Sequence, residues 1–523
     1  MMRTMGGLLA AVCLAACGGE ATDRADVPVP AQPVASAAVD LGNGPFEASW
    51  SSVEARPEPA WFRDAKFGIF IHWGPYAVPA YAPVGNYAEW YGESMNPVPS
   101  SAYIGEHHAE LRAQTRAWHV KTYGEDFDYA RFAPMWRAEL WEPGDWADIF
   151  KDAGARYVVL TSKHHDGFAL WPSAHASASW GRPWNSVEVG PGRDVVGELS
   201  EAVRDAGLRM GLCYSNYEWY NPLYTNDPTD TDTVARFMDT HFRPQLRDLI
   251  TRYQPDILWG DGAWDHPSEV WGTPAIMAWM LNTHPRAEDV VFNDRWGNET
   301  RLGVGVHTSE YGAGRQASDP LWEENRGIGH SYGYNRMEDI ADYATRDELV
   351  MLLVDVVSRG GNLLLDVGPD ADGKIPPIQQ ERLRQIGAWL DVYGAGIFGT
   401  RAYRDGAQWS DGPRPETSTA TFKADYNVLR LTSQPAPGEA RKTVLFTRKS
   451  DTLHAFLTRV PEGDTVLRGV TLGDGAAAHW LGLDGEAVAW RQEGPDLVLN
   501  AVPSPERIRL GPPYGIVLTG LEE

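Results

Sequence analysis

Two successive segments of the chain repeat one order: an amphipathic helix, a glycine and a short apolar strand. Helices are expected over 145–153 and 195–206, and each is followed within a few residues by a strand, at 157–160 and at 209–212. A strand that returns to the same sheet after a helix runs parallel to the strand before it. This order predicts an α/β fold built on a parallel sheet.

Further apolar runs continue the pattern up to about residue 400. They predict strands at 67–71, 256–259, 290–292, 303–306 and 362–365. Polar or ionisable residues follow the C-terminal end of each strand, as at His72, His164, Asp261 and Glu310. Loops converge at that end of a closed barrel, so the region 45–400 is expected to be a (β/α)8-like barrel. A doubly wound sheet is the alternative, but it would gather its polar groups at a single switch point.

The helical pattern stops after residue 400. Short alternating runs separated by Gly, Pro and Asp follow at 427–431, 443–447, 452–457, 464–470, 497–502 and 508–518. They predict that 401–523 forms a small antiparallel β-sandwich. Structural support of the barrel is the expected role of such a domain.

The first 44 residues have the features of an export signal and a spacer. A basic start at Arg3 and a short apolar stretch end at Cys17, so 1–17 resembles a bacterial lipoprotein signal peptide, with an ordinary secretory signal as the alternative. Residues 18–44 lack apolar periodicity and are expected to be a flexible linker. We therefore expect an exported protein, periplasmic or at the cell surface, that touches the membrane only through a lipid on Cys17. After processing, Cys213 has no partner for an intrachain disulfide.

The composition excludes some partners and favours others. A formal net charge of -25 argues against nucleic acid, whose phosphates require clustered Lys and Arg, and against adhesion to an anionic bilayer. The chain has 523 residues, 43% of them hydrophobic, which indicates more than one globular domain. Its 22 tryptophans favour carbohydrate, because an indole ring covers the apolar face of a sugar well.

Asp261 is the strongest candidate for a reacting group. It follows an apolar strand and lies between Trp259 and Trp264, a setting in which a carboxylate can attack an anomeric carbon beside an aromatic surface. The structural alternative is an ordinary turn aspartate before Gly262.

A series of motifs accompanies Asp261 through the barrel region. They occupy 66–74, 88–91, 157–168, 184–186, 192–194, 259–262, 293–297 and 361–365. Together and in this order they resemble the α-L-fucosidases of glycoside hydrolase family 29. The resemblance covers residues 61–400 and implies an exo-acting enzyme that removes terminal α-L-fucose from fucosylated glycans, without a cofactor.

By this resemblance Asp261 is the nucleophile of a double displacement that retains anomeric configuration. The acid/base must then be a second carboxyl about 5–5.5 Å away. Glu310 is the first candidate, because it follows the expected strand 303–306 and because the Glu310-Tyr311 pair resembles the acid/base segment of bacterial members. Glu323 is the alternative, because a Trp-Glu pair occurs at this place in animal relatives.

The resemblance also implies a set of residues that bind the sugar. They are His72, Glu89, Trp90, His164, His165, Tyr214, Trp259 and Arg295. No metal site is expected: neighbours on a strand point to opposite faces, so the adjacent His164 and His165 would not ligate one ion.

Two other functions remain as alternatives. The segment 329–333 matches the Gly-x-Ser-x-Gly elbow of serine esterases, with Ser331 as nucleophile, but 325–328 is not expected to form the strand that this elbow requires. A non-catalytic fucose-binding lipoprotein is the second alternative, and the carboxylates Asp261 and Glu310 argue against it. The sequence leaves the oligomeric state and the fucosyl linkage open.

Overall fold

The computed structural model describes residues 40–96, 106–299, 305–316, 320–417, 426–482 and 485–522. The expected signal peptide, Cys17 and the linker up to residue 39 lie outside the described residues. Residues from Asp40 onward already contact the barrel, since Asn282 Nδ2 donates to the carbonyl oxygens of Leu41 and Phe46 at 2.9 and 2.8 Å. None of the helices in the described ranges is long and apolar enough to cross a membrane.

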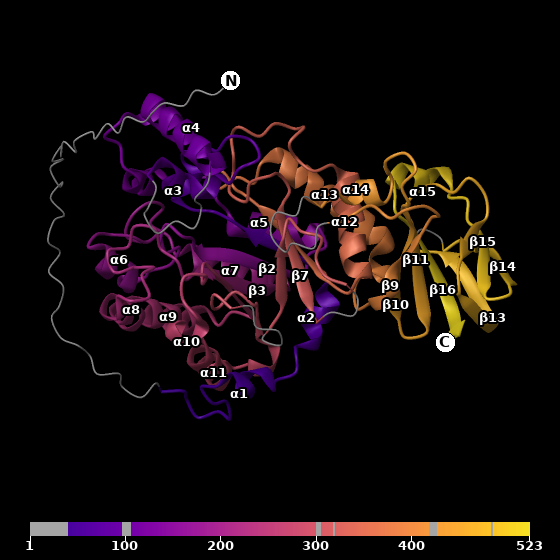
Figure 1. Cartoon of the computed structure of the whole chain (residues 1–523), viewed down its shortest axis with the longest axis horizontal. Coiled ribbons are helices and arrows are strands. Elements are labelled where there is room, and N and C mark those ends of the chain that lie inside the picture. Colours follow the sequence, from indigo (N-terminus) through magenta and orange to yellow (C-terminus); the bar gives the residue numbers. More distant parts are fainter. Residues whose placement is uncertain are drawn as a thin grey trace, which may run out of the picture. The chain divides into compact units, whose positions relative to one another are not determined.

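An eight-stranded parallel sheet forms the centre of the region 45–400 (Figure 1). Its strands are β1 (Phe67–Ile71), β2 (Tyr157–Lys163), β3 (Arg209–Ser215), β4 (Ile257–Asp261), β5 (Val291–Phe292), β6 (His307–Glu310), β7 (Trp322–Gly327) and β8 (Asn362–Val367). They pair in the order β5-β4-β3-β2-β1-β8-β7-β6, and a single parallel bridge between Asn293 and Val306 joins the two edges. The expected (β/α)8-like barrel is confirmed.

Helices precede and separate these strands. They are α1 (Trp50–Glu54), α2 (Ala60–Ala65), α3 (Tyr91–Met95), α4 (Glu106–Tyr123), α5 (Pro143–Asp152), α6 (Ala174–Trp180), α7 (Val195–Asp205), α8 (Thr231–Phe237), α9 (Arg243–Tyr253), α10 (Ser268–Trp271), α11 (Thr273–Thr283), α12 (Arg346–Ser358) and α13 (Pro377–Tyr393). The expected helices 145–153 and 195–206 correspond to α5 and α7.

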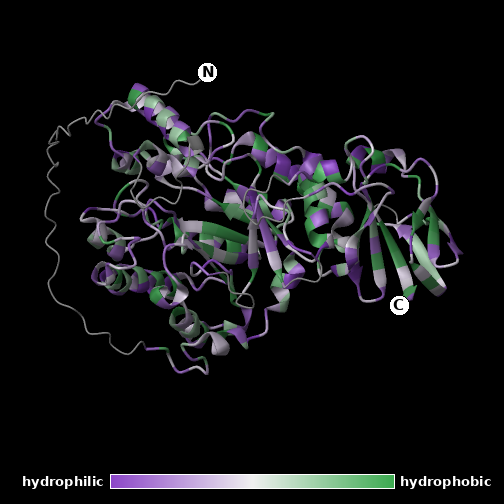
Figure 2. Cartoon of the chain, viewed as in Figure 1, coloured by the Kyte–Doolittle hydropathy of each residue, from purple (hydrophilic) through white to green (hydrophobic). Residues whose placement is uncertain are grey.

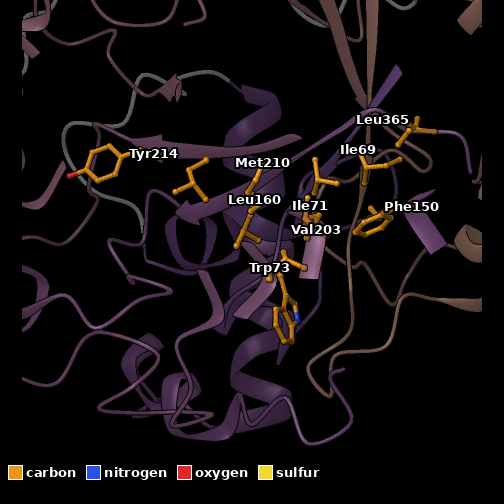
Figure 3. Packing of buried hydrophobic residues seen from close by; sticks show 14 of the residues in the cluster. Ile69, Ile71, Trp73, Phe150, Leu160, Val203, Met210, Tyr214 and Leu365 are labelled. Carbon is orange, nitrogen blue, oxygen red and sulfur yellow. The ribbon is translucent and has the colours of Figure 1, made fainter. Parts of the chain in front are cut away.

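The central strands are buried on both faces, which explains their nearly continuous apolar runs (Figure 2). On β1, Phe70 belongs to the cluster inside the barrel, whereas Ile69 and Ile71 belong to the cluster between the strands and the helices. Figure 3 shows Ile69, Ile71 and Leu160 packed in this outer layer with Phe150 of α5. Apolar burial on both faces fixes the register of the strands, and with it the positions of the residues at their C-terminal ends.

Two strands on one side of the barrel differ from the prediction. Residues 303 and 304 of the strand expected at 303–306 lie outside the described residues. The strand β6 begins at His307, so Glu310 is its last residue rather than a residue beyond it. β7 was not predicted at all, because its Glu-Glu-Asn-Arg segment has no apolar run. Its polar side chains are nevertheless buried because they find partners: Tyr157 donates a 2.5 Å hydrogen bond to Glu323.

The C-terminal region contains a five-stranded and a three-stranded antiparallel sheet. Its elements are β9 (Arg401–Trp409), α14 (Val428–Leu431), β10 (Lys442–Lys449), β11 (Thr452–Leu457), β12 (Thr465–Leu467), β13 (Thr471–Trp480), β14 (Ala489–Glu493), β15 (Asp496–Asn500), α15 (Pro505–Leu510) and β16 (Tyr514–Glu522). Residues of both sheets share one apolar cluster, so the predicted sandwich is confirmed.

Two of the strands expected in this region are wrong in part or in full. The segment 427–431 is the helix α14, because the Asn427 side chain accepts a hydrogen bond from the Arg430 N–H and caps it. The run 508–518 is divided between α15, which Ser504 caps, and β16.

The barrel and the sandwich meet at α12, which contacts β8 on one side and β9 and β10 on the other. Asp355 of this helix is buried and accepts hydrogen bonds from Lys442, Arg359 and Tyr426. Its partners hold the pKa of this carboxyl well below its usual value, although burial alone would raise it. This buried charged cluster joins the two domains.

Candidate active site

A cavity of about 400 Å³ lies at the C-terminal ends of the barrel strands. Residues from separate parts of the sequence line it: Phe70, His72, Tyr87, Glu89, Trp90, His164, His165, Trp259, Asp261, Trp264, Asp294, Arg295, Thr308, Glu310, Asn325 and Tyr332 are among them. All of the sequence-predicted site residues except Tyr214 and Glu323 are therefore brought together in one pocket.

Asp261 is the last residue of β4, and its backbone is held on both sides. The preceding Gly260 exchanges two hydrogen bonds with the side-chain amide of Asn293, at 2.7 and 2.9 Å. The following Gly262 has φ +70, and a Cβ there would lie 2.7 Å from the Cβ of Tyr217, so only glycine fits this turn. The Asp261 carboxylate points into the pocket, and 16% of its side chain is exposed.

Arg295 connects Asp261 to Glu310. Its Nη1 lies 3.3 Å from Asp261 Oδ1 and 3.1 Å from Glu310 Oε2. One nitrogen thus lies within hydrogen-bond distance of an oxygen of each carboxyl group, which keeps the two groups close together. Such proximity is compatible with the ~5–5.5 Å that separates the two carboxyl groups of a retaining glycosidase. Arg295 is itself fixed, because its Nε donates to Thr308 Oγ1 at 2.9 Å and its guanidinium lies over the Trp259 ring.

The surroundings of Glu310 favour its protonated form. Burial raises the pKa of this carboxyl above its usual value, and the negative charge of Asp261 raises it further, whereas Arg295 and the hydroxyl of Tyr87 oppose the shift. Tyr87 donates a 3.1 Å hydrogen bond to Glu310 Oε1. A carboxyl group with a raised pKa beside a second carboxyl group is suited to general acid catalysis.

Three histidines line one side of the pocket, and burial lowers the pKa of each, so they are neutral. His72 Nδ1 lies 2.6 Å from Asp366 Oδ1, and His165 Nδ1 lies 2.6 Å from Ser215 Oγ. His165 Nε2 lies 3.4 Å from Asp261 Oδ2. These contacts fix the ring orientations and leave His72 Nε2 and His165 Nε2 facing the cavity.

The expectation that His164 and His165 point to opposite faces is wrong, because both line the cavity. β2 ends at Lys163, so the alternation of an extended strand no longer applies to the two histidines. Their ring centroids are 4.2 Å apart. Within the described residues no group of three or more His, Cys, Asp or Glu side chains is arranged to hold a metal ion.

Tyr214 does not line the pocket, which corrects its predicted role. β3 extends to Ser215, so Tyr214 is still within the strand and its side chain points outward, opposite to that of Cys213. Its hydroxyl donates a 2.7 Å hydrogen bond to Gln245, and Figure 3 shows it among the buried residues of the outer core.

Glu323 lies inside the barrel rather than in the pocket. Tyr157 and Trp259 Nε1 donate hydrogen bonds to its two oxygens at 2.5 and 3.2 Å. Burial raises the pKa of Glu323 to about 7. Trp259 lines the cavity and Glu323 does not, so Glu310 is the better placed of the two acid candidates.

Ser331 lacks the partners of an esterase nucleophile. Its hydroxyl contacts Glu89 Oε2 at 3.1 Å and the carbonyl oxygen of Gly333 at 2.7 Å, and it accepts from the Ala88 N–H at 2.9 Å. The expectation that 325–328 forms no strand is wrong, because β7 reaches Gly327, but no helix follows directly; the next one, α12, begins at Arg346. The nucleophile elbow of a serine esterase requires a helix directly after the serine.

Ser331 and Gly333 instead fix Glu89. Its Oε2 also accepts a 2.9 Å hydrogen bond from the Gly333 N–H, and burial raises the pKa of this carboxyl to about 7. The neighbouring Trp90 packs edge-on against His165, with centroids 4.9 Å apart. This corner of the pocket offers a carboxyl group and an indole to a ligand.

Sequence reasoning missed Tyr87, Tyr332 and Thr308, which line the cavity, and the partnership of Asp366 with His72. Tyr87 directly precedes the recognised motif 88–91, so its position was a usable signal. Nothing in the local sequence marks Tyr332 or Thr308 as pocket residues.

Comparisons with known proteins identify the family of the chain. Residues 34–395 match the family model described as Alpha-L-fucosidase. The chain is 36% identical to rat tissue alpha-L-fucosidase over 463 residues, 88% of each chain, and 38% identical to the human tissue enzyme over 387 residues, 73% of this chain and 78% of the other. The crystal structure of a Thermotoga maritima alpha-fucosidase in complex with a mechanism-based inhibitor is similar with a TM-score of 0.70 and 33% identity, covering 91% of this chain and 100% of that one.

Proposed function

Because the chain belongs to the α-L-fucosidase family, we propose that its pocket holds the terminal α-L-fucose of a glycan between Asp261 as nucleophile and Glu310 as acid/base. The chain is a glycoside hydrolase that acts on α-L-fucosides and retains anomeric configuration. The observation that carries the assignment of roles is the position of Arg295 Nη1 between the two carboxyl groups.

In the first step Asp261 attacks C1 of fucose while Glu310 gives its proton to the departing glycosidic oxygen. A carboxylate nucleophile needs no base, only alignment with C1, and the fixed turn at Gly260-Asp261-Gly262 supplies that alignment. The C1–O bond breaks, an ester between Asp261 and fucose forms, and the acceptor sugar leaves as an alcohol.

In the second step Glu310 acts as a base. Esterification removes the charge of Asp261, which had raised the pKa of Glu310, so the acid form is no longer favoured to the same degree. Glu310 then takes a proton from water as the water oxygen attacks C1 and Asp261 leaves as a carboxylate. Two inversions give overall retention.

Sugar recognition is assigned to the other polar and aromatic groups that line the pocket. The neutral imidazoles of His72, His164 and His165 and the carboxyl of Glu89 are hydrogen-bonding partners for fucose hydroxyls. Trp90 covers one side of the pocket. The aromatic wall that includes Phe70, Trp259 and Tyr332 suits the C5 methyl group of a 6-deoxy sugar.

Incubation with an aryl α-L-fucoside tests this function directly. Release of the phenol is expected from the wild type, together with weaker turnover of the matching α-L-galactoside, since an apolar wall rejects an extra hydroxyl only modestly. Asp261→Ala is the matched control and should bind fucose without releasing phenol. A wild type that binds fucose and releases no phenol would instead be a fucose-binding protein.

The location of the enzyme is a separate proposal. We infer from the motif that ends at Cys17 that the chain is exported and tethered by a lipid on this cysteine, in the periplasm or at the cell surface. Expression in a bacterium that processes lipoproteins should give a membrane-bound product whose mass includes the lipid. Cys17→Ser should give a product without lipid, and an identical mass shift in both would overturn the anchor.

A further inference from the structure

A second cavity, of about 420 Å³, lies next to the pocket of about 400 Å³. Aromatic and imidazole side chains line it, among them Tyr87, Tyr311, His330, Tyr343 and Tyr426. Tyr87 lines both cavities, so the two share a wall.

The shared wall is on the side of the acid/base. Tyr87 donates its hydrogen bond to Glu310 Oε1, and its ring stacks near that of Tyr311, with centroids 6.2 Å apart and an angle of 27° between the planes. Tyr332 of the first pocket packs edge-on against both rings, at 5.6 and 5.5 Å. The acid must touch the oxygen that leaves, so the rest of the substrate extends from this side.

The backbone turns sharply at the boundary of the two cavities. Glu310 lines the first cavity and Tyr311, the next residue, lines the second. Tyr311 has φ +48, a left-handed conformation that is rare for a bulky side chain and that must be held by its surroundings. Its hydroxyl is anchored: it accepts from the Gly327 N–H at 2.9 Å and lies 3.0 Å from the Gly329 carbonyl oxygen.

The charged groups of the second cavity already have partners. Arg326 is paired with Glu324 and lies over the Tyr311 ring. Glu348 closes the capping box of α12, and Asp342 accepts a 2.8 Å hydrogen bond from the Asp339 N–H. Rings with paired charges around them suit an uncharged ligand with apolar faces and hydroxyl edges.

We propose that the second cavity binds the leaving part of the substrate, a neutral oligosaccharide of at least two sugars whose rings lie against Tyr311 and its neighbours. This inference rests on the proposed function, because it requires the scissile bond to lie beside Glu310. The enzyme then selects fucosylated oligosaccharides by their acceptor sugars, through residues that do not touch fucose.

Two substrates separate this inference from the proposed function. α-L-Fucosyl fluoride has no acceptor sugar, and its fluoride ion departs without protonation by an acid. A fucosyllactose, in contrast, has two further sugars beyond the scissile bond. We would compare kcat/KM for the fluoride and for the 1→2- or 1→3-linked fucosyllactose, whichever the wild type cleaves faster. The fluoride reports on Asp261 and the fucose pocket alone.

Ala341 offers a matched pair of variants. It is exposed and lines the second cavity, so Ala341→Tyr should obstruct the cavity without disturbing the core, and Ala341→Ser should leave it open. We expect Ala341→Tyr to lower kcat/KM for the fucosyllactose roughly tenfold, with the fluoride within about twofold of wild type. His330→Ala should shift the same ratio in the same direction by a smaller factor, since its imidazole is at the exposed rim.

Each other outcome is decisive. If Ala341→Tyr leaves the fucosyllactose-to-fluoride ratio of wild type unchanged, or if the wild type cleaves the fluoride but neither trisaccharide, the second cavity is not the acceptor site and the proposed function stands. If the wild type cleaves neither the fluoride nor an aryl fucoside, the proposed function itself fails and the inference fails with it.

Discussion

Two clusters of charged side chains lie near the C-terminal ends of the barrel strands, one from β4 to β6 and the other beyond β2 and β3, and they are built differently. The catalytic cluster consists of Asp261, Glu310 and Arg295. The support cluster consists of Lys163, Glu218 and His241, and the side chains of all three are fully buried. One cluster faces the pocket and the other faces the helices.

The support cluster satisfies its charges almost completely. Glu218 accepts hydrogen bonds from Lys163, from His241 Nε2 at 2.7 Å, from Asn221 at 2.7 Å and from Trp180 at 3.2 Å. Burial alone would raise the pKa of Glu218, but His241 and Lys163 hold it well below its usual value. Such a carboxylate is stabilised in place and has no capacity left for a ligand.

The charge of Asp261 in the catalytic cluster is only partly compensated by close partners. Asp261 has contacts of 3.3 Å with Arg295 and 3.4 Å with His165, both longer than a strong charged hydrogen bond, and part of its side chain is exposed. A buried ion cluster becomes a reaction site when an acceptor is left free beside a cavity. Charge and burial alone do not distinguish the two clusters.

The largest effect is expected at the nucleophile. Asp261→Ala should lower kcat for an aryl fucoside by roughly 10⁴-fold or more, because no other carboxylate is aligned with C1. The free energy of unfolding should change little, since the Asp261 carboxylate lies at long range from both Arg295 and His165. Steady-state kinetics and urea denaturation on the same sample measure kcat and the free energy of unfolding. If Asp261→Ala lost stability but kept its activity, the distinction between the two clusters would be wrong.

The acid/base variant sharpens the comparison within the catalytic cluster. Glu310→Gln should lower kcat/KM for a fucosyl oligosaccharide by roughly 10²–10⁴-fold, because the departing sugar then receives no proton. α-L-Fucosyl fluoride, which needs no acid to leave, should be affected much less in its first step. A pre-steady-state burst of fluoride release measures that step; equal losses for both substrates would contradict the role of Glu310.

The support cluster should show the opposite response. Glu218→Gln removes the partner of Lys163 and should lower the free energy of unfolding by about 3–5 kcal/mol, as expected when one member of a buried ion pair is neutralised. Glu198→Gln, which affects the partly exposed pair with Arg193, is the control and should cost far less. Urea denaturation measures the free energy of unfolding of both variants. Equal losses would show that burial of the Glu218 pair does not contribute to stability.

The smallest effect concerns Glu323, a buried carboxyl that belongs to neither cluster. Its pKa of about 7 lies above its usual 4.5, so between these values the folded chain holds a proton that the unfolded chain has lost, and stability falls as pH rises. Glu323→Gln should remove up to about 1.4 kcal/mol per pH unit of this slope. Unfolding curves at several pH values between 4.5 and 7 measure the slope.

Activity supplies the contrast for Glu323→Gln. Its kcat on a fucosyl oligosaccharide should stay within a few-fold of wild type, because Glu323 lies beneath Trp259 and outside the pocket. An unchanged pH slope with a collapse of kcat would make Glu323 the acid and displace Glu310.

Much of the barrel could be predicted because its strands are apolar. β1, β2, β3, β4 and β8 contain apolar runs that no exposed element would carry, and the family motifs placed Asp261 and the histidines His72, His164 and His165 at or just after the C-terminal ends of these strands. β7 could not be predicted, since its polar residues become buried only through partners such as Tyr157 from a distant strand. Local sequence does not reveal such pairings.

The errors at Tyr214 and at His164-His165 have one physical cause. Side chains alternate between the two sides of a strand only while it remains extended, so the exact end of the strand decides which residues face the pocket. β3 extends past Tyr214, which turns it outward, whereas β2 ends before the two histidines and lets both face inward. Apolar runs locate a strand but not its last residue.

The stereochemistry of azide products tests the central claim most directly. With an aryl α-L-fucoside and azide, Asp261→Gly should give β-L-fucosyl azide, because azide enters the place of the missing carboxylate and inverts C1. Glu310→Ala should give α-L-fucosyl azide, because azide attacks the ester on Asp261 and the two inversions cancel. Formation of α-azide by Asp261→Gly, or of β-azide by Glu310→Ala, would contradict the roles given to these two carboxyl groups.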